Sequence, residues 1–392
     1  MKFLFFSTQF VEPWLGSEEL WSRTASHLLA QGHEVAFAYR HWPDRPARLK
    51  ELEAKGARAF YMGDPAAKAG FVTRAVRVLK RKLKMGVATH TPHVLVTQCL
   101  EFKPDAVYVS ADEVYEADWM APAFEELKRL GISTAIGSQR ETEWEHLSDY
   151  RRSDLQRSFR AVTLPVFVSR HGLSMMRRQL AMPLKDAVVV RNPTASSGQP
   201  VPWSSVTSPT RAIACVARIN CQDKGQDLVF EVLSQPAWRE RDWKLTLYGR
   251  GWDERYLAEL ASLYQLTDRI VFAGHVHGID KVWAENELFV LASRREGSPL
   301  ALIEACYAGR AAVVTDIGGN AEWVEEGRTG WIAEAPSVRS LGAAMERAWK
   351  NRDAWPAMGQ AARRLADARD PDPCATLSAH LIELASRPSV RS

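Results

Sequence analysis

The sequence predicts an α/β protein made of two doubly wound, Rossmann-like domains that face each other across a cleft. Short apolar runs alternate with helical stretches, one unpatterned segment divides this series into two similar parts, and 392 residues exceed one ordinary core. Strands that alternate with helices form parallel sheets through right-handed crossovers. Open sheets of this kind bind ligands at the carboxyl ends of their strands.

The first domain is predicted to span residues 1–193. Its expected strands are Lys2–Phe6, Glu34–Tyr39, Asp105–Ser110, Ser133–Gly137, Val162–Ser169 and Val188–Val190. A helix is expected from Ser17, a candidate N-cap followed by two glutamates, to Gly32. The apolar start of the chain stops at Ser7, which is too short for a signal peptide and predicts a buried strand.

Residues 194–210 are rich in Pro, Ser, Thr and Gly and have no hydrophobic period, so we expect a linker. The second domain is then predicted to span residues 211–370. Its expected strands are Ile213–Ala217, Lys244–Tyr248, Ile270–Phe272, Leu288–Leu291 and Ala312–Thr315. Residues 371–392 hold a further helix that can belong to either domain, and packing back on the first domain is one option.

Charge and cysteine usage exclude several classes of protein. A net charge of +4 favours anionic ligands in general but does not indicate nucleic acid. Five scattered cysteines form neither metal-type spacing nor a disulfide framework, so we expect a cytoplasmic protein without a metal site. Nothing approaches the roughly 20 apolar residues of a membrane span.

Two cations mark the start of the second domain. Arg218 follows a predicted strand, and Lys224-Gly225 opens the next helix, where backbone N–H groups converge. The pattern predicts a phosphate or diphosphate site, and two solvated cations near helix ends are the alternative. Gly249 and Gly251 follow the next strand, as a tight turn requires, but the dinucleotide-binding fingerprint is incomplete.

The stretch "RREGSPLALIEA" places Glu296 and Glu304 eight positions apart. Ser298 is a candidate N-cap and Pro299 the first helical residue. Glu296 is therefore expected just outside the helix start, and Glu304 about a turn and a half inside. From these residues alone, a pair of structural glutamates and a pair of ligand-binding glutamates both stay open.

Taken together, these segments resemble the family 4 glycosyltransferases of the GT-B fold. "YGRG", "VFAGHV" and "EGSPLALIEACYAGRAAVVTDIGGNAEWVEEGRTGWI" carry the resemblance, and "GSEELWSRTASHLLAQGHEV" resembles the family's glycine loop and first helix. The resemblance spans nearly the whole chain and is stronger after residue 211. It implies a retaining hexosyltransferase that uses a nucleotide-diphosphate sugar as co-substrate, without a metal or other cofactor. The acceptor would be a glycan, a lipid-linked sugar or a small molecule.

The resemblance also implies roles for individual residues. Arg218 and Lys224 would neutralise the diphosphate, and Glu296 would hold hydroxyls of the donor sugar. The remaining donor-binding residues would be Gly16, Gly249, Val276, Gly297, Ser298, Pro299, Leu300 and Glu304. Glu304 would accept hydrogen bonds from the ribose. The two glutamates would then clamp the donor and would not act as the acid and base of a hydrolase.

This sequence departs from the family pattern in its first half. One glycine, Gly16, stands where many members have two. Ser138 or Gln139 stands where the family often has a histidine that reaches the donor sugar, and these two residues are expected to contact the sugar instead. An amide can hydrogen-bond a hydroxyl but cannot carry a proton as histidine does. A catalytically silent nucleotide-sugar-binding protein is therefore an alternative, as is a GT-B nucleotide-sugar epimerase.

Residues 71–85 combine an apolar helical stripe with basic residues elsewhere on the same helix. Such a helix can lie on an anionic membrane or meet a lipid-linked acceptor. A helix packed on its sheet with a solvated basic back is the alternative. We therefore expect a cytoplasmic protein, with a peripheral place at the inner face of the membrane as a further option.

Overall fold

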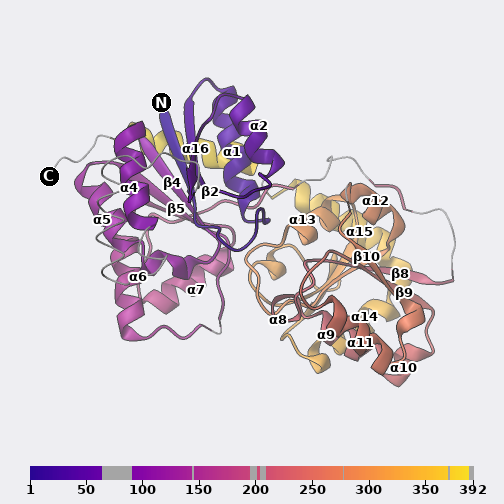
Figure 1. Cartoon of the computed structure of the whole chain (residues 1–392). Helices are drawn as coiled ribbons and strands as arrows, with labels where there is room; N and C mark the ends of the chain where they lie inside the picture. The colour runs from indigo at the N-terminus through magenta and orange to yellow at the C-terminus, as the bar shows by residue number, and fades with distance from the viewer. Residues whose placement is uncertain are drawn as a thin grey trace. The chain divides into compact units, whose positions relative to one another are not determined.

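The computed structural model describes residues 1–63, 91–143, 145–194, 201–203, 209–276, 278–369 and 371–387. The chain divides into two compact units: Met1–Arg191 with Asp372–Ser392, and Asn192–Pro371. Each unit contains one sheet with helices packed around it (Figure 1). Every pairing between neighbouring strands is parallel. Two α/β units with parallel sheets confirm the predicted fold class.

The sheet of the first unit has seven strands in the order β3-β2-β1-β4-β5-β6-β7. They are β1 (Lys2–Ser7), β2 (Glu34–Arg40), β3 (Arg58–Met62), β4 (Ala106–Ala111), β5 (Ser133–Ser138), β6 (Leu164–Phe167) and β7 (Val188–Val189). The central strands are buried almost throughout because helices cover both faces. β3 was not among the expected strands. It forms the edge of the sheet, is only partly buried, and lacks the apolar run of a central strand.

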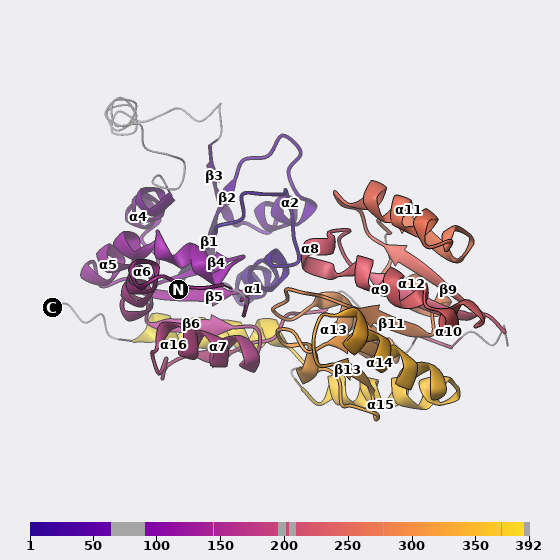
Figure 2. The ribbon, with the colours of Figure 1, turned by 90° about the horizontal axis from the view of Figure 1, so that it is seen from below.

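Helices of the first unit cover both sheet faces. They are α1 (Glu18–Ala30), α2 (Ala47–Ala54), α4 (Thr91–Phe102), α5 (Ala121–Arg129), α6 (Asp149–Ala161), α7 (Arg170–Leu180) and α16 (Pro373–Ser386), with a 3₁₀ turn at Val114–Asp118. Ser17 is the N-cap residue of α1, but its backbone is already helical and its side chain does not cap. The yellow α16 lies with the elements of this unit in Figure 1 and Figure 2, and packs against α1, β4 and β5.

The sheet of the second unit has six strands in the order β10-β9-β8-β11-β12-β13. They are β8 (Arg211–Val216), β9 (Trp243–Tyr248), β10 (Ile270–Gly274), β11 (Leu288–Leu291), β12 (Ala311–Thr315) and β13 (Gly330–Ala333). The helices are α8 (Cys221–Lys224), α9 (Gln226–Leu233), α10 (Pro236–Arg239), α11 (Glu254–Leu263), α12 (Ile279–Glu285), α13 (Leu300–Tyr307), α14 (Val338–Lys350) and α15 (Trp355–Asp367). Short 3₁₀ turns lie at Thr267–Arg269, Asn320–Glu322 and Arg352–Ala354. β13, at the far edge, was also not among the expected strands.

Strand order locates the ligand-binding edge of the second unit. From β8 the chain first builds outward to β9 and β10, and then returns to the other side of β8 with β11. The loops that leave β8 and β11 therefore diverge, and such a switch point is where open α/β sheets bind ligands. Arg218 follows β8 and Glu296 follows β11, so both lie at this point.

The basic helix predicted for residues 71–85 lies outside the described residues, so its contact with a membrane stays a prediction. Among the helices that the structure describes, none combines the length and the hydropathy needed to cross a membrane.

Candidate active site

A glycine brings the first cation to the switch point. Gly225 has φ +63°, and a Cβ added there would lie 2.1 Å from the carbonyl oxygen of Ala292. Only glycine lets the chain pass this close to the end of β11 in this conformation. Lys224 was expected to open a helix, but it closes the short α8, and Gly225 is the N-cap residue of α9. The close passage places Lys224 beside the loop that follows β11.

Backbone hydrogen bonds tie that loop to α8 and α9. The amides of Arg294 and Arg295 donate to the carbonyl of Asp223 at 2.8 and 3.1 Å. The Arg294 guanidinium also forms a two-bonded ion pair with the Asp227 carboxylate at 2.7 and 2.8 Å. Bidentate pairs of this kind fix geometry as well as charge. The loop that carries Glu296 is thus held against the segment that carries Lys224.

Lys224 and Glu296 form an ion pair. Lys224 Nζ lies 2.5 Å from Glu296 Oε1, and the Ser293 hydroxyl donates to the same oxygen at 2.9 Å. The side chains are 19% and 7% exposed. A carboxylate this deeply buried is stable as an ion only with a charged or donating partner. The two residues assigned to different parts of a donor are therefore partners in this structure.

Arg218 lies in the same group of charges. Its guanidinium is 3.4 Å from Asp223 Oδ2 and 5.7 Å from the centre of the Trp252 ring. Asp223 is buried, and its carboxylate also lies 3.5 Å from Arg295. Sequence reasoning missed Asp223, although it directly precedes Lys224. Three cations face the two carboxylates of Asp223 and Glu296, and this excess of positive charge favours an anionic ligand.

The start of α13 differs from the expectation. Ser298 was predicted as the N-cap and Pro299 as the first helical residue, but α13 begins at Leu300 and Pro299 is its N-cap residue. The Ser298 hydroxyl accepts a hydrogen bond from Trp323 Nε1 at 3.2 Å, so it does not cap the helix. The Ser298 carbonyl accepts from Asn192 Nδ2 at 3.0 Å. Among the residues that the structure describes, no side chain caps the backbone N–H groups at this helix start.

Residues around the helix start are packed closely. Gly319 N donates to the Gly297 carbonyl at 2.6 Å. A Cβ on Gly318, which has φ +56°, would lie 2.2 Å from the Glu296 carbonyl oxygen. The Gly-Gly turn after β12 therefore rests directly on the backbone of the glutamate loop. Glu304 is buried in the second turn of α13, at 8% exposure.

Gly249 connects the ends of three strands. It has φ +146°, and a Cβ there would lie 2.0 Å from the Ala217 carbonyl oxygen after β8. Its own N–H donates to the Gly274 carbonyl at the end of β10, at 2.8 Å. Val276 follows two residues later. The turn after β9 is thus attached to the neighbouring strand ends on both sides.

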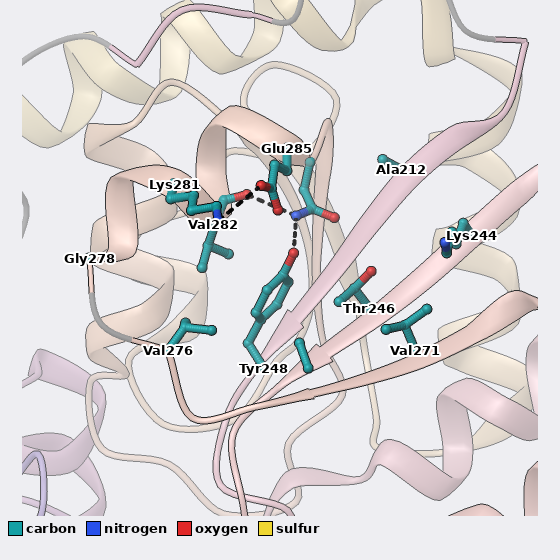
Figure 3. A pocket seen from close by; sticks show the side chains of 12 residues that line it. Ala212, Lys244, Thr246, Tyr248, Val271, Val276, Gly278, Lys281, Val282 and Glu285 are labelled. Atoms are coloured by element: carbon teal, nitrogen blue, oxygen red, sulfur yellow. Dashed lines mark hydrogen bonds and ion pairs between the residues drawn. The ribbon is translucent and has the colours of Figure 1, made fainter.

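A pocket of about 530 Å³ opens on the sheet face beside α12 (Figure 3). It is lined by Ala212, Lys244, Thr246, Tyr248, Val271, Ala273, Val276, Gly278, Lys281, Val282, Glu285 and Asn286. Figure 3 shows Tyr248 reaching across it from β9 toward α12, where its hydroxyl accepts from Asn286 Nδ2 at 2.9 Å. Val276 is the one predicted donor residue in this lining. Arg218, Lys224 and Glu296 are not part of this lining.

The other predicted residues belong to the first unit. Gly16 lies in the turn before α1, where its carbonyl accepts from the Glu19 amide at 3.2 Å. The Ser138 hydroxyl donates to Glu141 Oε1 at 2.5 Å. Gln139 is 6% exposed, and both polar atoms of its amide lack a partner among the described residues. A buried amide without partners is uncommon and marks a place where a polar ligand group can bind.

Sequence reasoning also missed Glu141. Its carboxyl group is buried against the first turn of α7, where a Cβ on Gly172 would lie 2.3 Å from Glu141 Oε2. Burial raises its pKa to about 7, and the Ser138 hydrogen bond opposes the shift. No local pattern in the sequence distinguishes this glutamate from its exposed neighbours.

The sequence of the second unit is similar to a known family. The family profile described as "Glycosyl transferases group 1" matches residues 210–351, which include Arg218, Lys224 and Glu296. The second unit is therefore similar to the domain that this profile describes.

Curated relatives match over part of the chain. N-acetyl-alpha-D-glucosaminyl L-malate synthase of Bacillus anthracis is 28% identical over 124 residues, 32% of each chain. The lipopolysaccharide core biosynthesis mannosyltransferase LpcC of Rhizobium leguminosarum bv. viciae is 31% identical over 136 residues, 33% of this chain and 38% of LpcC. The matched part spans about a third of the length of these relatives.

Solved structures match over nearly the whole chain. HepE of Anabaena in complex with UDP superposes with a TM-score of 0.73 at 16% identity, covering 98% of this chain and 100% of HepE. Sucrose-phosphate synthase of Thermosynechococcus elongatus gives 0.74 at 13% identity, covering 98% and 99%. These likenesses establish the GT-B fold.

Proposed function

We propose that this chain is a retaining glycosyltransferase that moves a sugar from a nucleotide-diphosphate sugar to an acceptor hydroxyl. The observation that carries the proposal is the Lys224–Glu296 ion pair beside Arg218, at the switch point of the unit that matches the glycosyltransferase group 1 profile. Lys224 supplies an ammonium that can bind a diphosphate. Once the diphosphate has replaced Glu296 as the partner of Lys224, the Glu296 carboxylate is free to bind a sugar.

The charges match the reaction that is proposed. Cleavage of a glycosyl–phosphate bond develops negative charge on the departing diphosphate, and fixed cations there lower the barrier. Arg218 and Lys224 fill this role. When the diphosphate becomes the partner of Lys224, Glu296 is released to accept hydrogen bonds from the sugar hydroxyls. In this proposal Glu304 accepts from the ribose.

Two cations and the uncapped start of α13 supply the positive charge that a metal ion provides in other transferases. We therefore propose that the enzyme needs no metal. Turnover that persists unchanged in excess EDTA supports this part of the proposal, and loss of turnover that added Mg²⁺ restores contradicts it.

Structural neighbours guide the choice of donor. HepE was solved with UDP and with UDP-glucose, and the pneumococcal transferase GtfA with UDP and GlcNAc. UDP-sugars are therefore the first donors to test. The first unit is proposed to bind the acceptor, which is a glycan, a lipid-linked sugar or a small molecule.

The experiment measures thermal stabilisation by UDP-, GDP-, ADP- and dTDP-sugars without metal, followed by slow hydrolysis of any stabilising donor. We expect one nucleotide class to stabilise the protein and to be hydrolysed, with the sugar released in the α configuration from an α-linked donor. Glu296→Gln is the matched control and should be stabilised without hydrolysis. The absence of stabilisation by every donor would overturn the proposal.

One feature of the sequence favours an alternative function. Ser138 or Gln139 stands where the family often has a histidine, and neither side chain can carry a proton as histidine does. A catalytically silent nucleotide-sugar-binding protein would be stabilised by a donor but would neither hydrolyse nor transfer it with any acceptor. Conversion of the donor sugar without transfer would indicate an epimerase.

A further inference from the structure

Strand order places the turn after β9 between two parts of the proposed donor site. β9 lies between β8, which precedes Arg218, and β10, which precedes Val276. The Arg250 carbonyl accepts from Ile219 N at 2.9 Å on the β8 side, and Gly249 N donates to Gly274 at 2.8 Å on the β10 side. This turn therefore adjoins the cation proposed for the diphosphate.

On the other side of β8, beyond β11, a second turn occupies the carboxyl edge of the sheet. Beyond β11, the turn at Gly318 and Gly319 packs on the backbone of Glu296 and Gly297, with one hydrogen bond of 2.6 Å. A nucleoside attached to a diphosphate at Arg218 and Lys224 therefore finds space on the β9 and β10 side.

The turn after β9 is held rigidly. A Cβ on Gly251 would lie 1.9 Å from the Ile219 carbonyl oxygen, and Gly251 N donates to Glu254 Oε1 at 2.9 Å. Asp253 Oδ2 accepts from Cys221 N at 2.7 Å. These contacts hold the two chain neighbours of Trp252 in place, so the backbone position of Trp252 does not depend on a bound ligand.

Trp252 is exposed despite this rigid support. Its side chain is 70% exposed, whereas Trp21, Trp243 and Trp283 are buried. The Arg218 guanidinium lies 5.7 Å from the ring centre and orients the indole by a cation–π contact. An exposed indole on a fixed backbone offers a flat surface on which another ring can stack.

Arg250 is the second unusual side chain of this turn. It is exposed, and its Nε lies 3.6 Å from the position a Cβ would take on Gly274. Its guanidinium makes no hydrogen bond or ion pair with the part of the chain that the structure describes, whereas Arg218 and Arg294 each face a carboxylate. Arg250 therefore has donors available beside the end of β10.

We propose that Trp252 and Arg250 form a nucleobase-binding clamp, an inference that rests on the proposed function. The base stacks on the Trp252 indole, which any nucleobase can do. Arg250 donates hydrogen bonds to the edge of the base. Because a guanidinium only donates, it favours bases with exocyclic carbonyl oxygens, such as uracil and guanine, over adenine.

The test compares the affinities of UDP, ADP and inorganic pyrophosphate by calorimetry for the full chain. Trp252→Ala should weaken UDP and ADP binding alike, by about tenfold or more, and leave pyrophosphate binding unchanged. Arg250→Ala should weaken UDP binding several-fold and leave ADP and pyrophosphate unchanged. Leu263→Ala and Arg255→Ala, which alter exposed residues of α11, are the matched controls and should change none of the three.

Tryptophan fluorescence gives an independent readout. Acrylamide quenches exposed indoles, so UDP should protect part of the emission of the wild type, and Trp252→Phe should lose that protected part.

The possible failures can be told apart. If the wild type binds UDP but both variants bind it equally well, the clamp is wrong and the proposed function stands. Equal losses of UDP and pyrophosphate in Trp252→Ala would assign the residue to the diphosphate and would also overturn the clamp. If the wild type binds neither UDP nor pyrophosphate, the proposed function fails and the clamp fails with it.

Discussion

Lys224 and Glu296, 72 positions apart in the chain, form an ion pair with 2.5 Å between Nζ and Oε1 at the end of the second sheet. The pair neutralises each residue while no anion is bound. A diphosphate that takes over Lys224 supplies the charge that Glu296 gives up, so donor binding and release of the carboxylate are coupled by one exchange of partners.

Lys224→Ala tests the first half of this exchange. Because the ammonium is proposed to contact the diphosphate and not the nucleoside, the variant should bind UDP about tenfold or more weakly and bind uridine nearly as the wild type does. Titration calorimetry measures both. Equal losses for UDP and uridine would remove Lys224 from the diphosphate site.

Glu296→Gln tests the second half. Donor hydrolysis and transfer should fall by about a hundredfold or more while UDP binding persists, because the charge is proposed to act on the sugar. The variant should also be destabilised by about 1–3 kcal/mol, since Lys224 loses its charged partner in a mostly buried place. Adding Lys224→Met should recover part of that stability but none of the activity. Recovery of both would indicate a purely structural pair.

Gly225→Ala tests the close approach that places Lys224. The substitution should lower the free energy of unfolding by about 3 kcal/mol or more, because strain at positive φ adds to a clash with a backbone carbonyl. Gly327→Ala is the control, with φ +71° but open space around it, and should cost only about 1 kcal/mol. Urea denaturation compares the two variants. Similar losses would mean that the carbonyl of Ala292 moves aside easily.

Glu141→Gln tests a pH dependence in the first unit. The folded carboxyl has a pKa of about 7 against an ordinary 4.5, so between these values the unfolded chain loses a proton that the folded chain keeps. The wild type is therefore destabilised as pH rises through this window, and the glutamine variant escapes that loss.

The stability of Glu141→Gln relative to wild type should rise by on the order of 3 kcal/mol between pH 4.5 and pH 8. Denaturation at the two pH values measures this difference. Burial also raises the pKa of Glu18 to about 7 and that of Glu116 to about 8, so the variant keeps some pH dependence of its own. The same stability difference at both pH values would show that Glu141 is ionised in the folded protein.

The sequence by itself determined the two parallel sheets and the segments that form the candidate site. Central strands such as β1 and β11 are buried on both faces, so each appears as a continuous apolar run. The edge strand β3 was missed because it is only partly buried and lacks such a run, and β13 was missed because it has only four residues and begins with a glycine. The segments around Arg218, Lys224 and Glu296 were found because glycine and charge at strand ends are local signals.

Only the tertiary structure decided which of these groups are partners. The contact of Lys224 with Glu296 depends on how closely α8 passes β11, and the role of Asp223 depends on two arginines from separate loops. Ser298 shows why the local sequence is not sufficient. Local rules predict that its hydroxyl caps the helix, but the hydroxyl instead accepts a hydrogen bond from Trp323, which is distant in the sequence. Periodicity reports which face of an element is buried, whereas a buried polar group bonds whichever partner the packing of distant segments brings within reach.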